Sequence, residues 1–164
     1  MYRYLFEKDC FNRIFKINKK INLDIQKKVK NILANTLKIK YEYIEVVYYK
    51  KTDNGVEFKV EAEKKIAENF VFRVSIEITE YDSTYVSLDT FISRIVPTQL
   101  AGPVVTEDIF SNLIQEFSKK TFYVDLIADY KLKYEELSKK IYEELEMLFG
   151  FESVYQINND NQKE

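Results

Sequence analysis

The residues whose spacing best suits catalysis are Glu57, Lys59 and Glu61, in the stretch VEFKVEAE at 56–63. Side chains two apart on a strand share a face, so these three could reach one divalent metal ion, as the acid and lysine of restriction-type nucleases do. A strand with one charged, solvated face gives the same spacing without any chemistry. The aspartate expected one strand earlier has no candidate, because Asp53 falls in a turn. We favour the solvated face and keep a divalent-metal-dependent nuclease as an alternative function.

A second carboxylate pair, Asp125 and Asp129, lies one helical turn apart and could share a magnesium ion. Lys131 and Lys133 follow directly, which is the pattern of a solvated helix edge. No further ligand for a metal stands out. We therefore predict no metal site and no cofactor.

The composition excludes several classes of catalytic site. Histidine is absent, which removes Ser-His-Asp and Cys-His arrangements and His-ligated zinc. Glycine occurs only at 55, 102 and 150, so neither a P-loop nor a Rossmann phosphate loop can be written. Cys10 is the single cysteine, for which we predict a small buried hydrophobe. The sequence therefore predicts no catalytic residue, and we expect a protein that is not an enzyme.

Charge divides the chain into a basic start and an acidic remainder. Residues 1–40 hold 11 Lys and Arg against 3 Asp and Glu, whereas residues 41–164 hold 14 against 24. Two parts of one fold that attract each other explain such a division, and so does a charged contact with a partner. Lys27, Lys28 and Lys30, near aromatic residues, keep a nucleic-acid binder through the basic N-terminal region as a further alternative.

Length and hydropathy favour one intracellular domain. The chain has 164 residues and is 46% hydrophobic, enough for a single core. Its apolar runs are far shorter than the roughly 20 residues that cross a bilayer. The first residues, MYRYLFEKDC, lack the pattern of a signal peptide. We predict a cytoplasmic protein, or a virion component if it is viral, with no membrane contact.

The N-terminal region contains one clear helix, at residues 21–37. Its apolar residues recur at helical spacing, with lysines on the opposite side and Asn22 in the N-cap position. The apolar positions are Ile21, Ile25, Val29, Ile32, Leu33 and Leu37. The preceding residues mix β-formers without a clean period, which fits either a short strand or an extended arm.

After this helix the period changes to two and predicts four strands, at 41–49, 56–63, 70–80 and 84–96. Short turns around 53–55 and 81–83 connect them, so we expect an antiparallel meander. Strand 56–63 has Val56, Phe58, Val60 and Ala62 on one face and charges on the other. One face of the sheet is therefore expected to pack in the core and the other to be exposed to solvent.

The tyrosine-rich strand YEYIEVVYY at 41–49 does not separate its faces. A three-residue loop at 53–55 puts Ile44, Val46 and Tyr48 in the core and leaves Tyr41, Tyr43, Val47 and Tyr49 opposite. A two-residue loop at Asn54-Gly55 reverses the two sets, since a slip of one residue inverts every side chain. Either register leaves an apolar row that a helix of the same chain or a second subunit must cover.

Both prolines and Gly102 fall in the segment 96–105, which we predict as a connecting loop with unusually apolar residues, Leu100 and Val104 among them. Two C-terminal helices follow. The first is capped by Thr106 and runs to about 117, and the second runs from about 124 to 148 with Gly150 as a left-handed C-cap. Residues 153–164 are polar and are expected to be a disordered tail.

These patterns predict an α+β fold: an N-terminal helix, a four-stranded antiparallel meander sheet and two C-terminal helices packed on it, forming a single domain at 1–152. The function they favour is non-catalytic assembly, as a homo-oligomer or within a larger protein complex. By layout alone this suits a phage or viral structural subunit of connector or tail-completion type, or a small inhibitor of a host complex. The predicted partner-binding residues are Tyr41, Tyr43, Val47, Tyr49, Leu100 and Val104.

Overall fold

The structure is a computed structural model that describes residues 2–17, 23–67, 70–97 and 109–150. Leu100, Val104, the cap residues Asn22 and Thr106, and the predicted tail at 153–164 lie outside the described residues. The boundaries of the predicted domain stay a prediction. The α+β class is confirmed, since helices pack on one antiparallel sheet.

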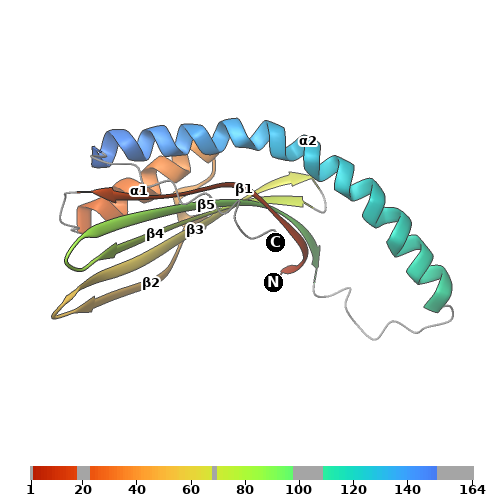
Figure 1. Cartoon of the computed structure of the whole chain (residues 1–164), viewed down its shortest axis with the longest axis horizontal. Helices are drawn as coiled ribbons and strands as arrows, with labels where there is room; N and C mark the ends of the chain where they lie inside the picture. Colours follow the sequence, from red (N-terminus) through yellow and green to blue (C-terminus); the bar gives the residue numbers. More distant parts are fainter. Residues whose placement is uncertain (1, 18–22, 68–69, 98–108, 151–164) are drawn as a thin grey trace, which may run out of the picture.

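The sheet has five antiparallel strands in the order β1-β5-β4-β3-β2. Four of them form the predicted meander. They are β2 (Glu45–Thr52), β3 (Gly55–Ala67), β4 (Phe70–Glu80) and β5 (Thr84–Pro97). The predicted strand at 41–49 begins later than expected, because Tyr41–Tyr43 form a short 3-10 turn, η1, before β2. β2 and β1 are the two edges of the sheet (Figure 1).

The prediction of four strands is wrong by one, because β1 (Tyr2–Ile17) pairs with β5 along its whole length. Two register shifts, between Tyr4 and Phe6 and between Asp9 and Phe11, interrupt this pairing. Each shift moves the following side chains to the other face. Cys10 and Phe11 are consequently both buried although they are neighbours, which is why the period of two is absent from the sequence.

The prediction of two separate C-terminal helices is also wrong, because α2 is continuous from Ile109–Phe149. The predicted break at 119–121 contains only lysines and a threonine, and none of these residues stops a helix. At 41 residues α2 is about 60 Å long at 1.5 Å per residue. Figure 1 shows its first part running past the end of the sheet. Its end is the predicted one: Gly150 has φ +58° and donates to the Glu146 carbonyl at 2.7 Å.

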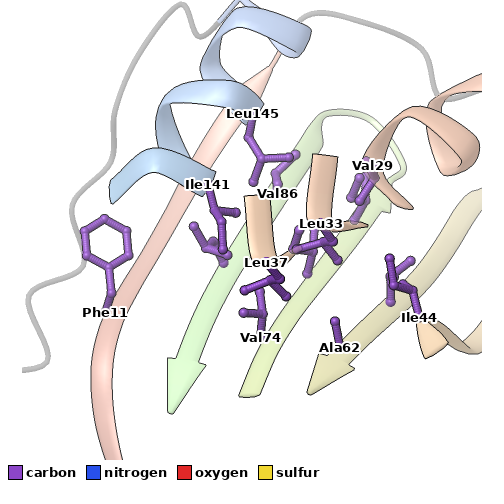
Figure 2. Packing of buried hydrophobic residues seen from close by; sticks show 14 of the residues in the cluster. Phe11, Val29, Leu33, Leu37, Ile44, Ala62, Val74, Val86, Ile141 and Leu145 are labelled. Atoms are coloured by element: carbon purple, nitrogen blue, oxygen red, sulfur yellow. The ribbon is translucent and has the colours of Figure 1, made fainter. Parts of the chain in front are cut away.

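Helices α1 (Leu23–Leu37) and α2 lie on the same face of the sheet (Figure 1). Every fourth residue of α1 is buried, and α2 buries a stripe in its last third. In Figure 2 Leu33 and Ile141 point toward sheet residues such as Val74 and Val86. The covered face of the sheet contributes aromatic and aliphatic side chains, among them Phe58, Val60, Phe72, Ile76, Leu88 and Ile92. The other face carries the charged alternate residues that the pattern predicted. Within the described residues no helix is long and apolar enough to cross a membrane.

The hairpin between β2 and β3 adopts neither predicted register. Thr52 pairs with Gly55, so the loop consists of Asp53 and Asn54. Val46 pairs with Val60 and Tyr48 pairs with Lys59, which leaves Val47 as a bulge between them. The bulge inverts the faces halfway along β2. Val46 therefore faces the covered side, Tyr48 the open side, and Tyr49 opposite Phe58 the covered side again.

Candidate interaction surface

Five residues of η1 and β2 form an exposed patch that we call the tyrosine surface: Tyr41, Tyr43, Val47, Tyr48 and Tyr49. Tyr43 is 66% exposed and Val47 43% exposed. Only Ile44 in this segment is fully buried, and Val46 is half-buried. The four predicted partner-binding residues that the structure describes are therefore all exposed: Tyr41 and Tyr43 lie on η1, and Val47 and Tyr49 lie on β2, an edge strand of the sheet.

Lysines hold the first two tyrosines in position. The Lys30 ammonium of α1 lies 4.2 Å from the ring centre of Tyr41, and the Lys40 ammonium lies 6.0 Å from that of Tyr43. A cation above an aromatic face is attracted by the ring quadrupole, by about 0.5–1 kcal/mol at exposed sites. Tyr49 stacks obliquely on Phe58 with 6.5 Å between ring centres. Much of each ring stays accessible.

Tyr48 belongs to a different environment, because the bulge turns it to the open face of the sheet. Partial burial, together with a hydrogen bond to Glu77, raises the pKa of Tyr48 to about 12. Tyr81, at the turn after β4, donates a hydrogen bond to Glu57, and this bond raises the pKa of Tyr81. Two tyrosine–glutamate pairs thus lie side by side near the hairpin tips. The three-residue loop, which would have put Tyr48 in the core, is not the one that forms.

The three residues of the nuclease alternative lie on the open face but are engaged with other groups. Glu57 accepts the hydrogen bond from Tyr81, and the Lys59 ammonium is 3.3 Å from a Glu61 oxygen. Across the described ranges no group of three acidic, histidine or cysteine residues is arranged to hold a metal ion. Asp129, of the second carboxylate pair, is exposed on α2. The geometry adds nothing to either metal hypothesis.

A hollow of about 250 Å³ marks the middle of the open face and contains Asp89, which sequence reasoning did not single out. Lys59, Arg73 and Glu77 are among its walls. The Ser87 hydroxyl donates to an Asp89 oxygen at 3.1 Å, and the amide of Asn12 on β1 reaches the other oxygen. Burial raises the pKa of Asp89. The sequence pattern that could have identified Asp89 is the alternation in SLDTF, which puts this residue on the outer face of the sheet.

The lysines of the nucleic-acid alternative lie along α1. Lys27 and Lys28 are exposed, whereas Lys30 is half-buried against Tyr41. Two exposed lysines on one helix are compatible with a solvated helix face as well as with phosphate contacts. The structure therefore favours neither interpretation of this basic stretch.

Comparison with known proteins adds no assignment. No protein-family model matches the chain, and no match is found among curated proteins or among solved structures. The function must therefore be argued from the residues themselves.

Proposed function

We propose that this chain is a non-catalytic assembly protein that associates with copies of itself through the tyrosine surface. The observation that carries the proposal is the exposure of Tyr41 and Tyr43 on η1 and of Val47 and Tyr49 on the edge strand β2 that follows it. Tyrosine is enriched at protein interfaces because it contributes large contact area at low cost in side-chain entropy. A cluster of this kind on one edge is more than the scattered apolar exposure of an ordinary surface.

The edge itself supports strand-to-strand recognition. β2 pairs with β3 on one side only, so its outer backbone N–H and C=O groups face solvent. Such an edge can pair with a strand of another chain. The bulge at Val47 and the lysines at 50 and 51 are features that restrict unspecific pairing. A matching partner must therefore fit the side chains as well as the backbone.

A second copy of β2 provides that match when the two strands run antiparallel. Glu45 lies near the start of β2, and Lys50 and Lys51 lie near its end. Antiparallel pairing brings the start of each strand beside the end of the other, so opposite charges meet at both ends. The valines at 46 and 47 then lie near the tyrosines at 48 and 49 of the other copy. Such an arrangement is the isologous interface of a two-fold dimer.

Light scattering coupled to size exclusion, over a range of loading concentrations, tests the proposal. We expect a molar mass above 19.6 kDa that rises with concentration. Tyr43→Ser and Val47→Ser should each weaken association, by roughly 30-fold if the residue is worth about 2 kcal/mol at the interface.

Tyr85→Ser is the matched control. Tyr85 is 44% exposed but lies on β5, which two strands separate from β2, so its loss should leave association unchanged. A chain of monomeric mass at every concentration would refute the proposal, and so would equal weakening by Tyr85→Ser.

A further inference from the structure

A groove of about 780 Å³ lies between α1 and α2 beside β3, and no residue of the tyrosine surface is among its lining residues. Its volume is within the range of small-molecule sites, about 300–1,000 Å³. Its lining combines polar side chains with the aliphatic side chains of Ile32 on α1 and Leu137 on α2. The lining residues are Asn31, Ile32, Asn35, Thr36, Lys38, Lys64, Leu137, Lys140, Glu143 and Glu144.

Three lysines from three different parts of the fold line this groove. Lys38 follows α1, Lys64 belongs to β3 and Lys140 to α2. None of the three forms an ion pair with any residue in the described part of the chain. Glu143 and Glu144 line the same groove, so three positive charges face two negative ones, and the remaining positive charge favours an anion.

Lys64 is the least expected of the three. It pairs with Phe72, in register with Phe58, Val60 and Ala62, so it occupies a position on the helix-covered face of the sheet. It is half-buried there. A charged residue at an inward position costs stability, and an apolar residue there would continue the pattern. The lysine at this position therefore points to a role other than stability. Its position at the open end of the core gives its ammonium group access to the groove.

Lys140 forms no ion pair in the described part of the chain, although a glutamate stands one turn away on each side of it. The neighbouring Lys139 pairs with Glu135 at 3.9 Å, with the glutamate one turn before the lysine. Glu136 stands in the same relation to Lys140, and Glu144 stands one turn after it. Because Lys140 pairs with neither, its ammonium group is available in the groove.

Lys38 is held by its backbone. It has φ +55°, a left-handed conformation that glycine normally supplies at this position after a helix. The next residue, Ile39, donates from its N–H to the Ala34 carbonyl at 3.2 Å and closes the end of α1. A lysine in this place keeps a strained backbone conformation, and its side chain is part of the lining of the groove.

The groove also contains uncharged polar side chains that could bind a ligand. The side chains of Asn31, Asn35 and Thr36 make no hydrogen bond to the residues that the structure describes, so their donors and acceptors are open to a ligand. Glu143 and Glu144 add acceptors that suit hydroxyl groups. We infer that the groove binds a small phosphorylated molecule rich in hydroxyl groups, such as a sugar phosphate, with the phosphate among the three lysines.

The groove does not coincide with the lysines of α1 that suggested nucleic acid. Lys27, Lys28 and Lys30 are not among its lining residues. Glu143 and Glu144 in the lining would repel the several phosphates of a polynucleotide more strongly than the single phosphate of a small ligand. A short polynucleotide is therefore a competing ligand that the experiment can distinguish.

Isothermal titration calorimetry at low ionic strength tests the inference, with glucose 6-phosphate as the probe. We expect saturable millimolar or tighter binding, weaker binding of inorganic phosphate and no binding of glucose. Lys64→Met and Lys140→Met should each reduce affinity about tenfold, because each removes one charge-assisted contact. Lys139→Met removes an equal charge one residue away, outside the groove, and should change affinity little.

Lys38→Gly separates binding from folding. Glycine relieves the left-handed strain, so we expect a higher melting temperature together with weaker binding of glucose 6-phosphate. Loss of binding in this more stable variant cannot be attributed to misfolding.

Three results would overturn the inference. They are no saturable binding of glucose 6-phosphate, equal loss of affinity in Lys139→Met and Lys140→Met, and binding of a single-stranded oligonucleotide at these lysines without binding of the sugar phosphate.

Discussion

Gly55 and Gly150 illustrate how one residue type meets two different structural needs. A Cβ atom added to Gly55 would collide with the backbone carbonyl of Glu80, which has no room to move. Gly150 has open space around it but a left-handed backbone with φ +58°. We expect Gly55→Ala to lower the free energy of unfolding by about 2–3 kcal/mol and Gly150→Ala by only about 1 kcal/mol. Urea denaturation measures both, and a smaller loss for Gly55→Ala would contradict this account.

Asp89 gives a prediction about pH. Burial in the open-face hollow raises its pKa, Asp9 and Glu77 add to the rise, and the Ser87 hydroxyl and Lys59 oppose it. The folded state therefore holds the proton more tightly than the unfolded chain. Stability falls as pH increases from the unfolded value of about 4 through the raised pKa of Asp89, and is then level with respect to this group.

Asp89→Asn removes this dependence while keeping the shape of the side chain. We expect the variant to be more stable than the wild type at pH 7, and the difference to shrink as the pH falls toward 4. Thermal unfolding at a series of pH values measures it. Identical pH profiles of the two proteins would mean that folding does not raise the pKa of Asp89.

At the residue scale the sequence predicted part of the candidate surface. Exposure in the segment 41–49 was expected because both sides of the predicted strand carry apolar residues, although Tyr41 and Tyr43 belong to η1 and not to the strand. The face of Tyr48 could not be predicted, because it depends on the bulge at Val47. A bulge is a property of strand pairing, and the spacing of the residues in 41–49 does not show where it falls.

The elements were predictable where their period is regular. α1 and strands β3 to β5 follow their patterns, whereas β1 contains two register shifts that hide its period. α2 was predicted as two helices because its apolar stripe changes around 119–121, although no residue there ends a helix. Continuity of the backbone and continuity of the apolar stripe are separate properties, and only the second can be read from spacing.

A buried polar contact fixes α2 against the sheet. The hydroxyl groups of Thr90 on β5 and Ser138 on α2 are 2.9 Å apart, and Ser138 also donates to the Tyr134 carbonyl at 2.8 Å. We expect Thr90→Val and Ser138→Ala each to cost about 1 kcal/mol, because each leaves a buried hydroxyl poorly paired.

The double variant should cost less than the sum of the two single variants, by about 0.5–1 kcal/mol, since it removes both partners together. Denaturation of the wild type, the two single variants and the double variant measures this difference in a double-mutant cycle. Strict additivity would show that the two hydroxyl groups do not depend on each other.

At the scale of the whole molecule, two helices cover one face of a sheet and leave the other face and one tyrosine-rich edge exposed (Figure 1). The sequence predicted the fold class and the division into covered and open faces, since both follow from local periodicity. It could not predict the lysine groove, because Lys38, Lys64 and Lys140 are brought together only by packing of α1, β3 and α2. Sites built from distant segments depend on tertiary structure.

The central claim is that the edge strand β2 is where copies of the chain meet, and hydrogen exchange at two protein concentrations tests it most directly. We expect the β2 amides that are not bonded to β3 to exchange more slowly as concentration rises, while the amides of β5 exchange at the same rate. The Tyr43→Ser variant should show no dependence on concentration in β2. Exchange in β2 that is equally fast at both concentrations in the wild type would contradict the claim.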